Sequence, residues 1–261
     1  MLANLLTYLG ALIALLNAEP QKQTYAVVVG ISDYKALTRL TGDLRFADRD
    51  AQQVVTFLQT RSGGAVPASH IRFLTNRQAT HANIRQALSL FREAKAGDRV
   101  IFYFSGHGLP SSFVPYDVQL DNQQNLLTYQ DIKAAFHDSK ASTKLCIADA
   151  CLSGGMTYQK ASQRSLVQTI ASTVSDDNNV AMLLASRSTQ SAVEAGQLAG
   201  GAFTHYLLKG LSGQADLNSD KVVTIRELHR YVAPRVRRVT QGQQTPIFYG
   251  HFSDELGLAY L

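Results

Sequence analysis

The sequence predicts an α/β protein whose mainly parallel central sheet is flanked by helices on both faces. Short apolar segments rich in Val, Ile, Leu and Phe alternate with longer segments whose apolar residues recur at helical spacing. The apolar segments are nearly continuous, as is typical of strands that are buried on both faces of a sheet. A regular alternation of strands and helices favours parallel pairing, with helices covering both faces.

The strands of this sheet are predicted at residues 25–32 (YAVVVGIS), 70–76 (HIRFLTN), 99–105 (RVIFYFS), 144–150 (KLCIADA) and 180–186 (VAMLLAS). Helices are predicted between them, over residues 43–60, 80–95 and 127–136, where a polar residue stands at or near the start and apolar residues repeat at helical intervals. Segment 153–179 is polar and lacks a strong period. A connection of this length inside a compact domain is usually functional or mobile.

The composition is that of a soluble globular protein, with 45% hydrophobic and 17% charged residues among 261, and we place its domain at residues 21–261. Its net charge of +5 comes from scattered basic residues, apart from an arginine cluster at 226–238. That cluster lacks the interleaved aromatic residues of nucleic-acid-binding modules, so no nucleic-acid partner is expected. The two cysteines are too close in sequence to link distant parts of the fold, which favours a reducing compartment and a cytoplasmic protein.

Residues 1–20 predict an N-terminal amphipathic or hydrophobic helix. The segment carries no charge before Glu19, and its large apolar residues recur at three- and four-residue intervals on one helix face. We expect this helix to dock on the domain, on a partner protein or on a second copy of the chain. Secretion or membrane association through residues 1–18 is the alternative, although the basic start of a signal peptide is missing.

A histidine and a cysteine follow two of the predicted strands, where parallel α/β sheets place their sites. His107 stands between Gly106 and Gly108, and Cys151 comes directly after a later strand. A neighbouring imidazole takes the proton of a thiol and later donates one to a leaving amine. The glycines leave room for a substrate backbone, and the Gly108 and Cys151 amides are suited to bind a developing oxyanion. Either residue alone is more often structural, and Cys146, inside its strand, is expected to be a buried structural thiol.

The motif SGHG, followed by DACLSGG with its cysteine 44 residues after the histidine, resembles the caspase-like cysteine peptidases. The resemblance is closest to their bacterial metacaspase and orthocaspase branch. It runs from about Tyr25 to the end and includes GGAFTHYLLKGLSGQADLNSDKVVTIRELHRYV at residues 200–232. The animal caspase signature is not matched, because Asp149 stands in place of its Gln. The resemblance implies a caspase-like fold and a catalytic dyad of Cys151 and His107.

The resemblance also implies a substrate preference. In the metacaspase-like branch, the acidic residue two positions before the cysteine and an Asp that opens the helix after the first strand line a pocket for a basic P1 side chain. Asp149 and Asp50 match these positions, and two carboxylates suit the forked donors of Arg better than Lys. The structural alternatives are a salt bridge on a helix face for Asp50 and a strand-end cap for Asp149. Ser186 is a candidate for main-chain pairing with an extended substrate.

Members of this family are often cleaved in the loop after the catalytic cysteine. Lys160 and Arg164 lie in that loop and would suit an enzyme selective for basic residues, so they are candidate self-cleavage positions. The alternative is an ordinary surface loop.

A further motif, DLNSDKVVTIRE at residues 216–227, has the spacing of an EF-hand calcium loop. Its predicted metal ligands are Asp216, Asn218, Asp220 and Glu227. The loop position that requires glycine holds Lys221 instead, which adds strain and a positive charge. Thr224 and Glu227 also predict a capping box that begins the next helix without a metal. We expect the capped turn, with structural calcium as the alternative.

Taken together, these patterns predict a cysteine endopeptidase that cleaves peptides or proteins after basic residues, Arg over Lys. It needs no cofactor for the chemistry and is a candidate for self-processing. The alternative is a catalytically silent caspase-like scaffold that acts through protein–protein interaction. A thiol hydrolase that is not a peptidase fits less well, because the implied pocket suits a cation on an extended chain.

Overall fold

The computed structural model describes residues 22–37, 43–109, 111–119, 121–122, 124–151, 180–187 and 200–261. The helix predicted for residues 1–20 and the connection at 153–179 lie outside these ranges. Within them, no helix has both the length and the hydropathy needed to cross a membrane.

The central sheet has the strand order β2-β1-β3-β6-β7-β9. Its strands are β1 (Thr24–Gly30), β2 (Ile71–Thr75), β3 (Arg99–Leu109), β6 (Thr143–Cys151), β7 (Val180–Arg187) and β9 (Gln244–His251). The first five are parallel, and β9 runs antiparallel to β7. The five predicted strands and their parallel pairing are therefore confirmed, whereas β9 was not predicted.

Four short strands complete the β structure: β4 (Ser112–Phe113), β5 (Leu127–Thr128), β8 (Val222–Thr224) and β10 (Gly257–Tyr260). The helices are α2 (Ala47–Gln59), α3 (His81–Leu88), α4 (Tyr129–His137), α6 (Ala202–Lys209) and α7 (Ile225–Val239). Short helical turns lie at η1 (Ala68–His70), η2 (Asn76–Gln78), η3 (Ser89–Glu93) and η4 (Gly210–Gln214). The three predicted helices are present but shorter than expected. In segment 80–95, the α-helix ends at Leu88 and a 3₁₀ turn follows it.

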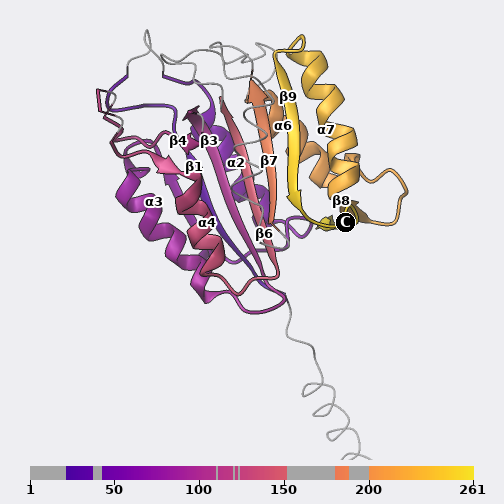
Figure 1. Cartoon of the computed structure of the whole chain (residues 1–261). Coiled ribbons are helices and arrows are strands. Elements are labelled where there is room, and N and C mark those ends of the chain that lie inside the picture. The colour runs from indigo at the N-terminus through magenta and orange to yellow at the C-terminus, as the bar shows by residue number, and fades with distance from the viewer. Residues whose placement is uncertain are drawn as a thin grey trace, which may run out of the picture.

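Helices cover both faces of the sheet (Figure 1), as the sequence predicts. Side chains alternate between the faces along each strand. Phe102 and Phe104 of β3 therefore pack in the core beside α3 and α4, while Ile101 and Tyr103 pack in the core beside α2, α6 and α7. Two hydrophobic cores thus fix the sheet between two helical layers.

The ends of β3 and β6 differ from the prediction in a way that matters for the site. β3 continues to Leu109 and β6 to Cys151, so His107 and Cys151 lie inside strands rather than after them. β3 can extend through its glycines because β4 pairs with its end, with Gly108 opposite Phe113. Backbone hydrogen-bonding groups that a loop would leave to water are paired here within the sheet.

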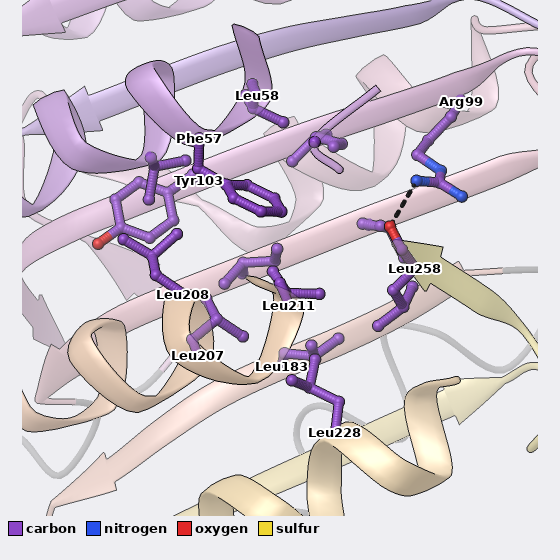
Figure 2. Close-up of a pocket in the computed structure, with 15 residues that line it drawn as sticks. Phe57, Leu58, Arg99, Tyr103, Leu183, Leu207, Leu208, Leu211, Leu228 and Leu258 are labelled. Carbon is purple, nitrogen blue, oxygen red and sulfur yellow. Dashed lines mark hydrogen bonds between the residues drawn. The ribbon is translucent and has the colours of Figure 1, made fainter. Parts of the chain in front are cut away.

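A small apolar cavity of about 40 Å³ lies between the sheet and helices α2, α6 and α7 (Figure 2). Arg99 stands at one end, where its guanidinium donates hydrogen bonds to the Leu258 carbonyl at 3.0 Å and the Gly257 carbonyl at 2.7 Å. Tyr103 stands at the other end. The cavity lining includes neither His107 nor the two aspartates singled out above, so this space is a feature of the core.

Candidate active site

Strand pairing brings His107 and Cys151 to the same level of the sheet. β3 and β6 are parallel neighbours, and His107 and Cys151 are register partners at the end of their ladder. The structure describes the backbone of Cys151 and both backbone and side chain of His107, which is half-buried. The predicted meeting of these two positions therefore follows from the sheet topology.

Tyr34 contacts His107 through both its hydroxyl group and its ring. The His107 backbone N–H donates a hydrogen bond to Tyr34 Oη at 2.7 Å, and the two rings lie 5.0 Å apart between centroids. Tyr34 is 2% exposed. No sequence pattern points to Tyr34, because Tyr34 and His107 are 73 positions apart and only the fold brings them together.

The role expected for Gly106 is wrong. A Cβ atom at this position would lie 2.6 Å from Tyr34 Oη and 2.9 Å from the Phe104 ring. The space beside Gly106 is therefore filled by the protein's own aromatic side chains and is not left for a substrate. Glycine is required here so that Tyr34 can reach the backbone of His107.

The direction of the Gly108 amide follows from the alternation of the strand backbone. The Val114 N–H donates to the His107 carbonyl at 3.0 Å, so the polar backbone groups of His107 face β4. Neighbouring residues of a strand direct their backbone groups to opposite edges. The amide of Gly108 consequently faces the β6 edge, where Cys151 lies.

Asp50 and Asp149 form a buried acidic pair. Asp50 stands in the first turn of α2 and is 3% exposed, while Asp149 stands in β6 and is 2% exposed. Such burial does not fit a salt bridge on a solvated helix face, the structural alternative considered for Asp50. The structure thus brings together the two carboxylates that the family resemblance singled out.

The first turn of α6 holds this acidic pair. The Gly201 N–H donates to both carboxylate oxygens of Asp50, at 3.1 and 3.0 Å. The Thr204 N–H and hydroxyl donate to Asp149 Oδ2, at 3.3 and 2.9 Å. Donors at a helix N-terminus stabilise negative charge, which offsets the cost of burying carboxylates. No motif marks Gly201 or Thr204 as a site residue, and the Gly-Gly pair before α6 is the signal that the sequence offers.

Tyr103 extends the hydrogen bonding into the core. Its hydroxyl lies 2.7 Å from Thr204 Oγ1. Burial raises the pKa of Tyr103 well above its usual value, and the nearby charges of Asp50 and Asp149 raise it further. Tyr103 is therefore a neutral hydroxyl group at physiological pH.

Cys146 is a structural thiol, as the sequence predicts. It is 1% exposed in β6, and burial raises its pKa to about 12. A thiol with this pKa carries almost no thiolate near pH 7, so it lacks the reactive form of a nucleophilic cysteine.

The remaining predicted substrate and cleavage positions lie at or beyond the limits of the described residues. The β6–β7 ladder ends at Ala148 and Leu184, two positions before Ser186, and the backbone of Ser186 pairs with Thr245 of β9 on the other side. Lys160 and Arg164 lie outside the described residues.

The turn at residues 216–227 has the predicted capping box. Thr224 accepts the Glu227 N–H at 3.3 Å, and Glu227 Oε2 accepts the Thr224 N–H at 3.0 Å, which begins α7. Burial acts to raise the pKa of Glu227, but hydrogen bonds from the Thr224 backbone and side chain and from the loop backbone together outweigh it, so the pKa lies below its usual value. No group of three or more His, Cys, Asp or Glu side chains is arranged to hold a metal ion in the part of the chain described.

The sheet order defines a caspase-like α/β protein whose candidate site residues lie at the carboxyl ends of its central parallel strands. The profile of the caspase domain matches residues 23–256. The chain therefore belongs to the caspase-domain family of peptidases, which confirms the family and the fold expected from the motifs.

Two further similarities accompany the family match. A probable protease from a Desulfuromonadales bacterium is 29% identical over 152 residues, which cover 49% of this chain and 18% of that relative. This chain thus spans less than a fifth of the relative's length. The crystal structure of a Geobacter sulfurreducens protein aligns with a TM-score of 0.56 and 18% identity, covering 88% of this chain and 94% of that one. This second similarity concerns the fold.

Proposed function

We propose that the protein is a cysteine endopeptidase in which Cys151 is the nucleophile and His107 the general acid and base. The observation that carries the proposal is the register pairing of these two residues at the end of adjacent parallel strands. Cys151 attacks the substrate carbonyl as its thiol proton passes to His107. His107 then gives a proton to the leaving amine, and water hydrolyses the thioester. No cofactor is needed for these steps.

Two backbone amides support this mechanism. We infer that the Gly108 N–H, which faces the β6 edge, acts with the Cys151 N–H as donors to the oxyanion. Ser186 lies beyond the end of the β6–β7 ladder, which suits main-chain pairing with an extended substrate. Tyr34 keeps the backbone of His107 in place.

The acidic pair supports selectivity for a basic P1 side chain. Asp50 and Asp149 are close enough that a Cβ atom on Gly201 would contact an oxygen of each. A guanidinium pairs with carboxylates through several parallel hydrogen bonds, whereas an ammonium acts as a point charge. We therefore infer cleavage after Arg in preference to Lys, as in the metacaspase-like branch that the motifs resemble.

The experiment that tests this function compares matched fluorogenic peptides with Arg, Lys or Asp at P1. Cleavage is expected in the order Arg, then Lys, with at least about a hundredfold lower kcat/KM for Asp, because two buried carboxylates repel a third. Cleavage after Asp would contradict the assignment of the acidic pair. A catalytically silent scaffold acting through its N-terminal segment would cleave none of the peptides.

Self-processing is a further part of the proposal. An enzyme selective for basic residues would cleave its own chain after Lys160 or Arg164. The double variant K160A/R164A is expected to remain a single chain on a denaturing gel while the wild type yields two fragments. Fragments of unchanged size from the double variant would show that these positions are not the cleavage sites.

Structural calcium in the 216–227 turn remains a second proposal. Asp216 Oδ1 is buried and has no hydrogen-bond partner among the described residues, which favours a cation at this position. Millimolar Ca²⁺ is then expected to raise Tm by about 2–4 °C, and the D220N variant to lose that rise. Equal Tm values with Ca²⁺, Mg²⁺ or a chelator would instead establish the capped turn alone.

A further inference from the structure

A chain of buried hydroxyl groups reaches the acidic pair from β3 through α6. We propose that Thr204 is a positioning residue for selectivity toward basic side chains, because it fixes the carboxylate of Asp149 that a substrate cation would meet. This inference rests on the proposed function and adds to it a residue from α6, an element not assigned to substrate recognition above.

The direction of each hydrogen bond follows from the number of protons available. Thr204 has one hydroxyl proton, and Thr204 Oγ1 donates it to Asp149 Oδ2 at 2.9 Å. The Tyr103 hydroxyl, 2.7 Å from Thr204 Oγ1, must then be the donor to Thr204. Both O–H groups point along one path that ends at Asp149. Hydrogen bonds aligned in this way polarise and strengthen each other in a low-dielectric interior.

This path has the rigidity that a positioning role requires. Thr204 and Tyr103 are both 0% exposed, so water does not compete for their hydroxyl groups. The Thr204 N–H also donates to Asp149 Oδ2, which gives that oxygen two donors from one residue. Rotation of the carboxylate would break both bonds and leave buried polar groups without partners.

Close packing at Gly201 limits the movement of the same carboxylates. A Cβ atom on Gly201 would overlap Asp149 Oδ2 and lie 2.7 Å from Asp50 Oδ2. The first turn of α6 therefore presses directly against both members of the acidic pair. A cation arriving at this pair would find its acceptors already oriented, which lowers the cost of binding.

The test uses the T204V variant, which keeps the shape of the side chain and the backbone N–H but removes the hydroxyl. Its substrates are two peptides that differ only in Arg or citrulline at P1, because citrulline has nearly the same shape without the charge. For the arginyl peptide, kcat/KM is expected to fall about tenfold to a hundredfold, mainly through KM. The citrullyl peptide is expected to change by less than about threefold.

Three controls separate positioning from general damage. T204S keeps the hydroxyl and is expected to keep wild-type selectivity. T56V makes the same Thr-to-Val change as T204V at an exposed position of α2 and is expected to behave as wild type. The rate of Cys151 alkylation by iodoacetamide is expected to be unchanged in T204V. Should T204V fail to fold, Y103F removes the preceding donor and is expected to lower the Arg to citrulline ratio about two- to tenfold.

Two results would overturn the inference while leaving the proposed function intact. One is a folded T204V variant with wild-type selectivity; the other is an equal loss for the arginyl and citrullyl peptides, which would indicate a structural role. A wild-type protein that fails to cleave the arginyl peptide would contradict the proposed function and this inference together.

Discussion

The C151A variant is expected to lose cleavage of the arginyl peptide, with kcat/KM lowered by at least about a thousandfold. The reason is that no covalent intermediate can form without the thiol, and the remaining backbone donors supply a small part of the acceleration. The H107A variant is expected to show a loss of similar size, since an unactivated thiol is largely protonated near pH 7. Steady-state kinetics with the arginyl peptide measures both effects.

The matched control is the other cysteine. Cys146 is buried within β6, and its high pKa keeps it a thiol. The C146A variant is expected to keep its activity while losing about 1 kcal/mol of stability through lost core contacts. Activity that survives in C151A but disappears in C146A would show that the nucleophile has been assigned to the wrong residue.

The D149N variant is expected to lower kcat/KM for the arginyl peptide by at least about a hundredfold and to spare the citrullyl peptide. Asparagine has the same shape but carries no charge, so a substrate cation loses a buried partner. The effect should lie mainly in KM, because Asp149 is proposed to bind the P1 side chain, whereas the chemistry takes place at Cys151, two residues further along β6. The measurement is the ratio of kcat/KM for the two peptides.

An exposed aspartate provides the control for charge alone. Asp254 forms a surface ion pair with Arg226 at 2.9 Å. D254N therefore makes the same change at a residue that has no proposed role in catalysis. Surface ion pairs contribute little to stability, and D254N is expected to keep wild-type selectivity. If D149N also kept wild-type selectivity, the acidic pair would be a structural anchor for α6 rather than a site for the substrate.

The parts of the fold that the sequence predicts are those with strong local signals. The buried parallel strands are continuous apolar runs, and their pairing follows from the helices between them. β9 escaped prediction because Pro246 interrupts its apolar pattern, and proline within a strand is tolerated at an edge, where β9 lies. The place of β9 in the sheet follows only from its antiparallel pairing with β7.

The site residues also fall into two groups: those that sequence motifs mark and those that only the fold brings together. His107 and Cys151 are recognisable because motifs surround them and their strands end at the same side of the sheet. Tyr34 and Thr204 are ordinary residues in sequence, and each meets its partner across a long separation, 73 positions for Tyr34 with His107 and 55 for Thr204 with Asp149. Contacts of this kind depend on how whole elements pack, which no local pattern specifies.

The surroundings of Gly106 do not follow from its motif. Two glycines beside a histidine predict open space, yet the fold fills the space at Gly106 with Tyr34 and Phe104. The same residue type thus serves close packing at Gly106, while Gly108 presents its amide toward β6.

The central claim, that Cys151 attacks substrates bearing a basic P1 residue, is tested most directly by covalent capture. A peptidyl chloromethyl ketone with Arg at P1 is incubated with the wild-type protein, and the modified residue is located by mass spectrometry. An adduct on Cys151 is expected, formed at least about tenfold faster than with the matching aspartyl ketone. An adduct confined to Cys146, faster reaction of the aspartyl ketone, or no adduct at all would contradict the claim.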